Sequence, residues 1–342
     1  MDDSVEKETQ LERVIGKLRS DGFACDLRMC LFVAALESYR HDSILRPYPP
    51  VGLREDGSKN IQKLTNLSSS IPSLSALNND SCLEPGVWSL LDWVLLKKFD
   101  VKTLDKSMFQ EIEKKTGHSS YNSTEPDYIF EIQYHENNAL NARFLALSEE
   151  CEVLYAYHGS RLENFHSILH NGLHSHLNKN SLFGEGTYLS SDLNVSIMYS
   201  TYSQAWSNSG LGEKLSCVAV CEVLNHPDVK CSLEDPRAAT SSPERRRSGS
   251  GASSVRARAK GSEGGDVPDR YYVVQNNQLL RVKYLLVYAE KRPQRNTQRT
   301  PPGTWFARLL IIYIIGLVLL GLSRTRAFHK LASYLQKEDT HL

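Results

Sequence analysis

The 342-residue sequence has few cysteines and no excess of charge. Its seven cysteines are odd in number, scattered and never spaced as Cys-x-x-Cys, which indicates neither a disulfide framework nor a zinc ribbon. Lys and Arg number 40, and so do Asp and Glu, which argues against a protein that binds phosphate backbones through its overall charge. We therefore expect reduced thiols, a cytosolic setting and no nucleic-acid partner.

The N-terminal segment, MDDSVEKETQLERVIGKL, lacks the apolar stretch of about 7 to 15 residues that a secretory signal contains. The other end differs, because residues 305–322 (WFARLLIIYIIGLVLLGL) form an apolar run in which Arg308 is the only charge. At about 1.5 Å per residue the run covers roughly 27 Å, near the thickness of an endoplasmic reticulum bilayer. The alternative is a buried core helix, but Trp305-Phe306 before the run and Arg324 after it are typical of a membrane span.

These patterns predict an α+β protein in several parts. Residues 5–99 predict a helical domain, with helices at 11–18, 25–39 and 87–99 and a Ser/Asn-rich loop at 66–80. Residues 100–290 predict a catalytic domain with a mixed β-sheet, with strands at 128–135, 153–160, 215–224, 271–276 and 280–290. A disordered Ser/Gly/Arg-rich insertion is expected at 233–261, a linker at 291–304, a transmembrane tail anchor at 305–322 and a short lumenal tail at 323–342.

Three segments contain candidate site residues: 157–173 (YHGSRLENFHSILHNGL), 181–200 (SLFGEGTYLSSDLNVSIMYS) and 264–288. Singly, each has a simpler explanation as a core histidine, an ordinary glycine loop or core aromatics. In order, they predict a strand that ends in His-Gly-Ser, a helix, a glycine loop that ends in Tyr188, and a short helix that carries Ser196 and Tyr199. Together they would place three ring systems around one cleft.

At these residues the chain resembles the poly(ADP-ribose) polymerase superfamily, the diphtheria-toxin-like ADP-ribosyltransferases. The motifs HGSRLENFHSIL, FGEGTY and LLRVKYLLVY occur in the family's order over roughly residues 126–290. The helical region before them and the tail after them are similar to a tail-anchored mono-ADP-ribosyltransferase branch of the endoplasmic reticulum. The resemblance implies NAD as co-substrate, no metal, transfer of ADP-ribose and release of nicotinamide.

The family's site residues transfer one by one onto this sequence. The resemblance implies that His158 bonds the adenosine ribose, since one imidazole nitrogen can donate while the other accepts. It implies that the main-chain N–H and C=O of Gly159 bind the nicotinamide carboxamide, and that the missing side chain lets the ligand approach closely. It also implies that the hydroxyl of Ser196 binds the same carboxamide. Tyr199 and Tyr188 would enclose the nicotinamide ring. The remaining residue implied to bind NAD is Ser160.

The third position of the family's catalytic triad is Tyr271, where chain-extending members have glutamate. A tyrosine, with a reference pKa of ~10, can hold the nicotinamide ribose but hardly deprotonate an incoming hydroxyl. The sequence therefore predicts a mono-ADP-ribosyltransferase with the triad His158, Tyr188 and Tyr271. Its acceptors would be membrane-proximal proteins and the chain itself.

Two other interpretations remain at this point. His166 and His170, at i and i+4, could share a metal with His174 and His176, although no cysteine or carboxylate ligand lies within the segment. The missing glutamate also fits a membrane-tethered scaffold that binds NAD or ADP-ribose without turnover. The expected location is the endoplasmic reticulum membrane or the nuclear envelope with the catalytic domain in the cytosol, where the sequon at Asn194, near the cleft, would carry no glycan.

Overall fold

The structure is a computed structural model that describes residues 2–117, 123–135, 138–174, 183–231, 267, 270–291, 303–324 and 330. The chain divides into two compact units, Met1–Glu290 and Lys291–Leu342. The predicted insertion at 233–261 lies outside the described residues, as does most of the predicted linker.

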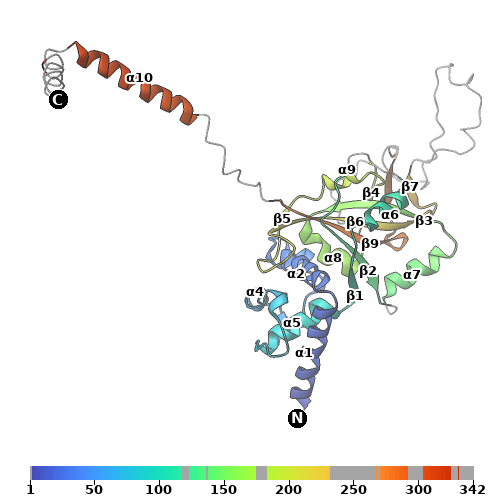
Figure 1. The fold of residues 1–342 in the computed structure, drawn as a ribbon. Coiled ribbons are helices and arrows are strands. Elements are labelled where there is room, and N and C mark those ends of the chain that lie inside the picture. The colour runs from blue at the N-terminus through green and yellow to red at the C-terminus, as the bar shows by residue number, and fades with distance from the viewer. Residues whose placement is uncertain are drawn as a thin grey trace, which may run out of the picture. The chain divides into compact units, whose positions relative to one another are not determined.

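The N-terminal part of the first unit is helical, as predicted (Figure 1). Helix α2 begins after Asp21, whose carboxylate accepts a hydrogen bond from the main-chain nitrogen of Ala24 at 3.0 Å and so caps the helix. Almost all of α2 is buried, because apolar residues occur on every side of it. The helical elements are α1 (Asp2–Ser20), α2 (Gly22–Glu37), α3 (His41–Ile44), η1 (Pro50–Gly52), α4 (Ile61–Ser69), η2 (Leu74–Ala76) and α5 (Pro85–Leu96).

The predicted loop at 66–80 was wrong at its start, because α4 continues to Ser69. Leu64 and Leu67 are buried on one face of this helix, and the hydroxyl of Ser69 donates to the carbonyl of Thr65 at 2.8 Å. Burial of Leu64 and Leu67 thus favours helix in a segment whose composition suggests a loop.

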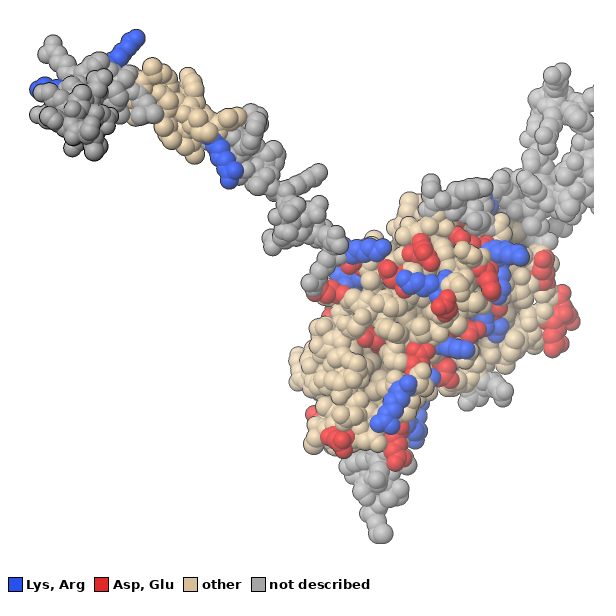
Figure 2. All heavy atoms as spheres, in the orientation of Figure 1, with Lys and Arg blue, Asp and Glu red and all other residues tan. Residues whose placement is uncertain are grey.

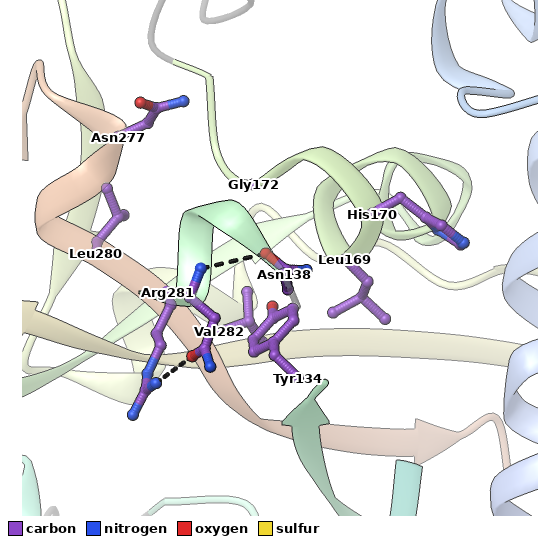
Figure 3. A pocket seen from close by; sticks show the side chains of 10 residues that line it. Tyr134, Asn138, Leu169, His170, Gly172, Asn277, Leu280, Arg281 and Val282 are labelled. Carbon is purple, nitrogen blue, oxygen red and sulfur yellow. Dashed lines mark hydrogen bonds between the residues drawn. The ribbon is translucent and has the colours of Figure 1, made fainter. Parts of the chain in front are cut away.

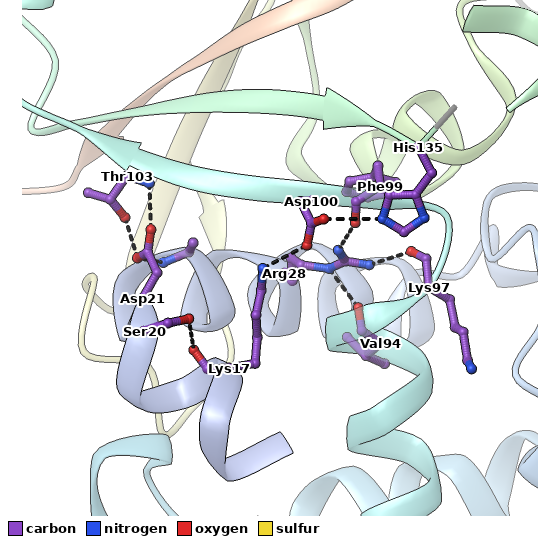
Figure 4. Close-up of polar contacts among 11 residues, drawn as sticks. Lys17, Ser20, Asp21, Arg28, Val94, Lys97, Phe99, Asp100, Thr103 and His135 are labelled. Atoms are coloured by element: carbon purple, nitrogen blue, oxygen red, sulfur yellow. Dashed lines mark hydrogen bonds and ion pairs between the residues drawn. The ribbon is translucent and has the colours of Figure 1, made fainter. Parts of the chain in front are cut away.

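The predicted helix at 87–99 ends earlier, at Leu96, where Arg28 from α2 binds carbonyls in and just after the last turn (Figure 4). Its buried guanidinium donates to the oxygen of Val94 at 2.6 Å and to that of Lys97 at 2.9 Å, and also to the oxygen of Phe99. Burial lowers the pKa of Arg28 to about 10, which leaves it cationic at neutral pH. These bonds satisfy the carbonyls at the end of α5, and strand β1 (Phe99–Leu104) begins directly afterwards.

Polar contacts and one continuous core join the helical part to the sheet. Asp21 also accepts from the nitrogen of Thr103 at 2.7 Å, and Lys17 lies 2.6 Å from the carboxylate of Asp100 (Figure 4). The same carboxylate lies 3.2 Å from Nε2 of His135. A single cluster of buried apolar side chains runs from the helices into the strands, so both belong to one compact unit.

The sheet follows the order β1-β2-β9-β6-β3-β4-β8-β7, with β5 paired to β6. A mixed sheet was expected, but every pairing among the described residues is antiparallel. The expectation was wrong because residue type identifies a strand without giving its direction. The remaining strands are β2 (Tyr128–Tyr134), β3 (Val153–Ser160), β4 (Thr187–Ser190), β5 (Ser203–Gln204), β6 (Lys214–Leu224), β7 (Val229–Cys231), β8 (Tyr271–Val274) and β9 (Leu280–Ala289).

The sheet divides between β3 and β4. These strands share one register pair, Tyr157↔Ser190, whereas β3 and β6 pair along the whole length of β3. Beyond this pair, β4, β8 and β7 form a separate three-stranded part. The helices and turns of this half are α6 (Met108–Lys115), α7 (Ala139–Ser148), η3 (Leu162–Asn164), α8 (Phe165–Asn171), α9 (Leu193–Ile197) and η7 (Asn277–Leu279).

The second unit contains helix α10 (Gly303–Ser323), over the run predicted to be helical. The apolar side chains described in it are exposed, among them Leu310, Ile312 and Leu320. Among the described residues, no helix has both the length and the apolar character required to cross a membrane.

Candidate active site

His158 lies at the division of the sheet, near the end of β3. It is 9% exposed, and its Nδ1 lies 2.9 Å from the main-chain oxygen of Tyr188 on β4. A carbonyl can only accept, so Nδ1 carries the proton and Nε2 is an acceptor. Burial lowers the pKa of His158, which keeps the ring neutral. Nε2 has no hydrogen-bond partner among the described residues and can accept from a ligand hydroxyl.

Gly159 has a structural reason to be glycine that differs from the expected one. A Cβ at this position would lie 1.8 Å from the main-chain oxygen of Ser196 and 3.1 Å from Cβ of Tyr199. The space that a side chain at this position would need is therefore occupied by the backbone of α9 and not by a ligand. Close packing of α9 on β3 brings Ser196 and Tyr199 beside Gly159, as the motif spacing predicted.

The two α9 residues differ in what they can offer. The Ser196 hydroxyl is buried and donates to the oxygen of Tyr157 at 3.0 Å, so toward a carboxamide it can only accept. Tyr199 lies just beyond the end of α9 and is 61% exposed, so its ring is available for stacking. Ser160, the remaining predicted NAD residue, accepts from the side chain of Asn164 at 3.0 Å.

Tyr188 is held by the glycine loop that precedes it. Its hydroxyl donates to the oxygen of Gly184 at 2.6 Å and accepts from the nitrogen of Phe183 at 3.0 Å. Gly184 has φ 98°, a left-handed conformation that favours glycine, which explains one glycine of the FGEGTY motif. The ring of Tyr188 is thereby fixed at both ends, by strand β4 and by the loop.

Tyr271 joins Tyr188 through a third ring that sequence reasoning did not select. The ring centroid of Phe183 lies 6.2 Å from that of Tyr188 and 6.4 Å from that of Tyr271. Tyr271 begins β8 and pairs with Ser190, two residues after Tyr188. The phenylalanine opens the FGEGTY motif, and its position before the glycine turn is the one sequence signal that could have identified it.

Histidines 166 and 170 are part of the core. Nε2 of His166 lies 3.1 Å from the oxygen of Pro47, and Nδ1 of His170 lies 2.8 Å from the oxygen of His166. The rings pack with Trp93, and burial lowers their pKa values to about 4 and about 2. No group of metal ligands is found among the described residues, which include His174 but not His176.

Two hollows lie away from the residues predicted to bind NAD. The first lies between α7, α8 and β9, and Figure 3 shows Arg281 and Asn138 at its edge. The second lies beside α5 and α8 and includes Trp93 and Lys98. Neither is lined by a residue predicted to bind NAD. On the visible face of the described residues, Lys and Arg interleave with Asp and Glu (Figure 2), in agreement with the equal charge counts.

The division of the antiparallel sheet thus holds a neutral buried histidine, a close strand–helix contact and the clustered rings of Phe183, Tyr188 and Tyr271. Comparison with known families supports the resemblance stated from the sequence motifs. Residues 106–290 match the poly(ADP-ribose) polymerase catalytic domain, and residues 16–95 match the ARTD15 N-terminal domain.

Individual relatives were also found. The chain is 45% identical over 312 residues to protein mono-ADP-ribosyltransferase PARP16 of Homo sapiens, which covers 90% of this chain and 92% of that protein. It is 44% identical over 313 residues to the protein of the same name from Mus musculus, with coverage of 90% and 93%. Protein mono-ADP-ribosyltransferase PARP8 of Mus musculus is 27% identical over 258 residues, with coverage of 60% and 28%.

The chain belongs to the poly(ADP-ribose) polymerase family of ADP-ribosyltransferases. The predicted resemblance is confirmed, and so is the prediction of an NAD-dependent protein mono-ADP-ribosyltransferase. An enzyme is therefore favoured over a scaffold without turnover.

Proposed function

We propose that this enzyme binds NAD at the division between β3 and β4 and transfers single ADP-ribose units to protein side chains on the cytosolic face of the endoplasmic reticulum. The observation that carries the placement of NAD is the hydrogen bond between His158 and the oxygen of Tyr188, which leaves Nε2 of His158 as an acceptor. In this proposal His158 holds the adenosine ribose, while Tyr188, Tyr199 and Ser196 hold the nicotinamide. Tyr271 holds the nicotinamide ribose.

The chemistry places modest demands on these side chains. Cleavage of the bond between ribose and nicotinamide develops positive charge on the ribose carbon, as in glycoside hydrolysis, so orientation matters more than a strong base. Tyr188 suits this task because its hydroxyl is bound to the glycine loop and cannot swing away. Ser196 can accept from the carboxamide while it donates to Tyr157. The nucleophile comes from the acceptor protein.

Transfer of labelled ADP-ribose from NAD, followed by mass spectrometry of the product, tests this proposal. We expect a single mass increment of one ADP-ribose on the chain or on an added acceptor. The variant His158→Ala should lose transfer. The variant His226→Ala, at a partly exposed histidine outside the site, serves as the matched control and should keep it. Equal activity of the two variants would show that NAD binds elsewhere.

We further propose that α10 anchors the enzyme in the membrane. Support comes from the apolar run at 305–322, from the helix of 21 residues that contains it, and from its exposed apolar side chains. At about 1.5 Å per residue, the 18 residues of the run would cover roughly 27 Å as a helix, close to the thickness of a bilayer core. The first unit would then remain on the cytosolic side, where the acceptors would be membrane-proximal proteins and the chain's own insertion and linker.

Protease protection on intact microsomes tests this topology. We expect the first unit to be digested while an epitope after residue 323 is protected. The double variant Ile312→Arg and Leu317→Arg should release the chain from the membrane fraction, because charge at the centre of a span is costly. A glycan on the sequon at Asn66 would place the first unit in the lumen and contradict the topology.

A further inference from the structure

Lys230 is a buried cation close to the candidate site. It lies in β7 and is 4% exposed, and its Nζ donates to the oxygen of Phe183 at 3.0 Å. Burial of an ammonium group is costly unless the group is hydrogen-bonded, so a lysine at this position is not explained by packing alone. Sequence reasoning gave no role to this residue.

The segment that receives this bond is the one that holds Tyr188. The main-chain nitrogen of Phe183 donates to the Tyr188 hydroxyl, which donates in turn to the main-chain oxygen of Gly184. One phenol hydroxyl therefore holds two peptide groups of this segment. The ring of Phe183 contacts both Tyr188 and Tyr271. Lys230 therefore bonds the same residue whose nitrogen and ring contact the two tyrosines.

The register of the sheet puts these groups on one face. Val273 of β8 pairs with Tyr188 of β4 on one side and with Lys230 of β7 on the other. Directly opposed residues in antiparallel strands point to the same face, and Tyr271, two residues before Val273, shares it. The lysine and both tyrosines thus project from three neighbouring strands toward the Phe183 segment.

We propose that Lys230 is a positioning residue for the nicotinamide end of the site. Its bond to the oxygen of Phe183 fixes the Phe183–Gly184 segment, which then holds the Tyr188 hydroxyl and places the Phe183 ring between the two tyrosines. The inference rests on the proposed function, because it assumes that Tyr188 and Tyr271 contact the nicotinamide half of NAD. His158, which would bind the other half, is bonded to the main-chain oxygen of Tyr188, whereas Lys230 bonds the segment that holds the hydroxyl of that tyrosine.

The test compares the binding of nicotinamide with the binding of ADP-ribose, which represent the two ends of NAD. In the full chain, Lys230→Met keeps the length and volume of the side chain but removes the donor. We expect nicotinamide to inhibit the variant about tenfold more weakly and the KM for NAD to rise, because a lost buried hydrogen bond and a looser ring cluster act at that end. Affinity for ADP-ribose, measured by calorimetry, should stay within about twofold of the wild type, since its adenosine end is held by His158.

Two further variants distinguish positioning from a general structural effect. Lys230→Arg retains a donor, so nicotinamide inhibition should recover toward the wild-type value. Tyr188→Phe removes the hydroxyl that bonds the same segment, so the double variant with Lys230→Met should be weakened less than the sum of the single effects. Lys214→Met is the matched control, because Lys214 is exposed and pairs with Glu290 at 2.8 Å. The same substitution there should change neither the inhibition by nicotinamide nor the affinity for ADP-ribose.

Three results would overturn the role of Lys230 alone: equal weakening of nicotinamide and ADP-ribose, additivity with Tyr188→Phe, or failure to fold of both Lys230→Met and Lys230→Leu. In the last case the lysine would serve the stability of the sheet. A wild-type chain that binds no nicotinamide, or a His158→Ala variant that binds ADP-ribose normally, would instead overturn the site itself and the role of Lys230 with it.

Discussion

Nδ1 of His158 lies 2.9 Å from the main-chain oxygen of Tyr188, a bond that crosses from β3 to β4 where the sheet divides. It joins two residues of the predicted triad through the backbone of one of them. Because the carbonyl accepts, the bond sets the tautomer of the histidine and directs its acceptor nitrogen away from the strand. The hydrogen bond that crosses the division of the sheet therefore also fixes the tautomer in which His158 can bind a ligand.

Substitution of His158 should separate its two tasks, which are the bond from Nδ1 to Tyr188 and the acceptance of a ligand bond by Nε2. His158→Ala removes both the donor and the acceptor, and we expect transfer to fall by ~10²-fold, since loosened reacting geometry can have that effect. His158→Asn keeps an N–H near the position of Nδ1 but has no acceptor where Nε2 lies. It should lose as much activity as the alanine variant while its melting temperature stays closer to the wild type. An asparagine variant with full activity would contradict the role of Nε2.

Gly159→Ala should damage both the fold and the site. The added Cβ would overlap the main-chain oxygen of Ser196 at 1.8 Å, and this backbone atom cannot move aside as the end of a flexible side chain could. We expect displacement of α9, a loss of stability of several kcal/mol and weak nicotinamide binding, in line with ~1–3 kcal/mol for ordinary overpacking and more for a backbone clash.

The matched control for this substitution is Gly16→Ala in α1, where an added Cβ meets nothing within 4 Å. Alanine is the better helix former by ~1 kcal/mol, so this variant should melt at or slightly above the wild-type temperature. Thermal melts and nicotinamide inhibition of both variants check the prediction. A Gly159→Ala chain with wild-type melting would show that α9 can move away from β3 at little cost.

Stability should fall as the pH is lowered below about 6.5, the reference value of histidine. Burial lowers the pKa of His166 to about 4 and that of His170 to about 2, so both stay neutral in the folded chain while the unfolded chain takes up protons. The unfolded state then binds more protons between pH 6.5 and 4, and each histidine removes up to ~1.4 kcal/mol of stability per pH unit there. The stabilising contribution is complete above pH 6.5.

Chemical denaturation at pH 7.5, 6.0 and 5.0 measures this slope. His170→Phe keeps an aromatic ring against Trp93, removes one titrating group and removes a buried Nε2 that has no hydrogen-bond partner. The variant should therefore have a shallower slope and at least wild-type stability at pH 7.5. His226→Phe, at a partly exposed histidine, is the control and should keep the wild-type slope. Equal slopes in all three chains would exclude His170 as a source of the slope.

The sequence predicts those parts of the fold that depend on local pattern. The strand predicted at 153–160 has the observed bounds, and the helix predicted at 25–39 differs from α2 by a few residues at each end. Both predictions rest on the spacing of apolar residues within the segment itself. The end of α5 was misplaced because Arg28 reaches it from another helix, and no local pattern contains such a contact.

The candidate site shows the same limit. Motif spacing brought His158, Gly159 and Ser196 together correctly, because glycine must occur where α9 packs on β3. Lys230 was missed because it is separated from Phe183 by 47 positions and stands in a three-residue strand without any motif. The roles of all the predicted site residues toward NAD remain predictions, since each is placed in the structure only through contacts with other residues of the chain.

The length of the product depends on Tyr271. A phenol there can hold the nicotinamide ribose but is a poor base at neutral pH, so the wild-type chain should attach single ADP-ribose units. Tyr271→Phe keeps the ring packed near Phe183 and loses the hydroxyl. We expect transfer to fall through a lost hydrogen bond of ~1 kcal/mol, and by up to about tenfold if that bond tightens in the transition state.

The neighbouring Tyr272→Phe is the matched control, because Tyr272 packs against the other face of the sheet and should leave transfer unchanged. Tyr271→Glu restores a base but not a pocket for an incoming ADP-ribose, so we do not expect it to extend chains. Gel electrophoresis of labelled products, with digestion by a chain-cleaving glycohydrolase, reads both results. A ladder of high-mass product from the wild-type chain, after contaminating polymerase has been excluded, would refute transfer of single units and the role of Tyr271 with it.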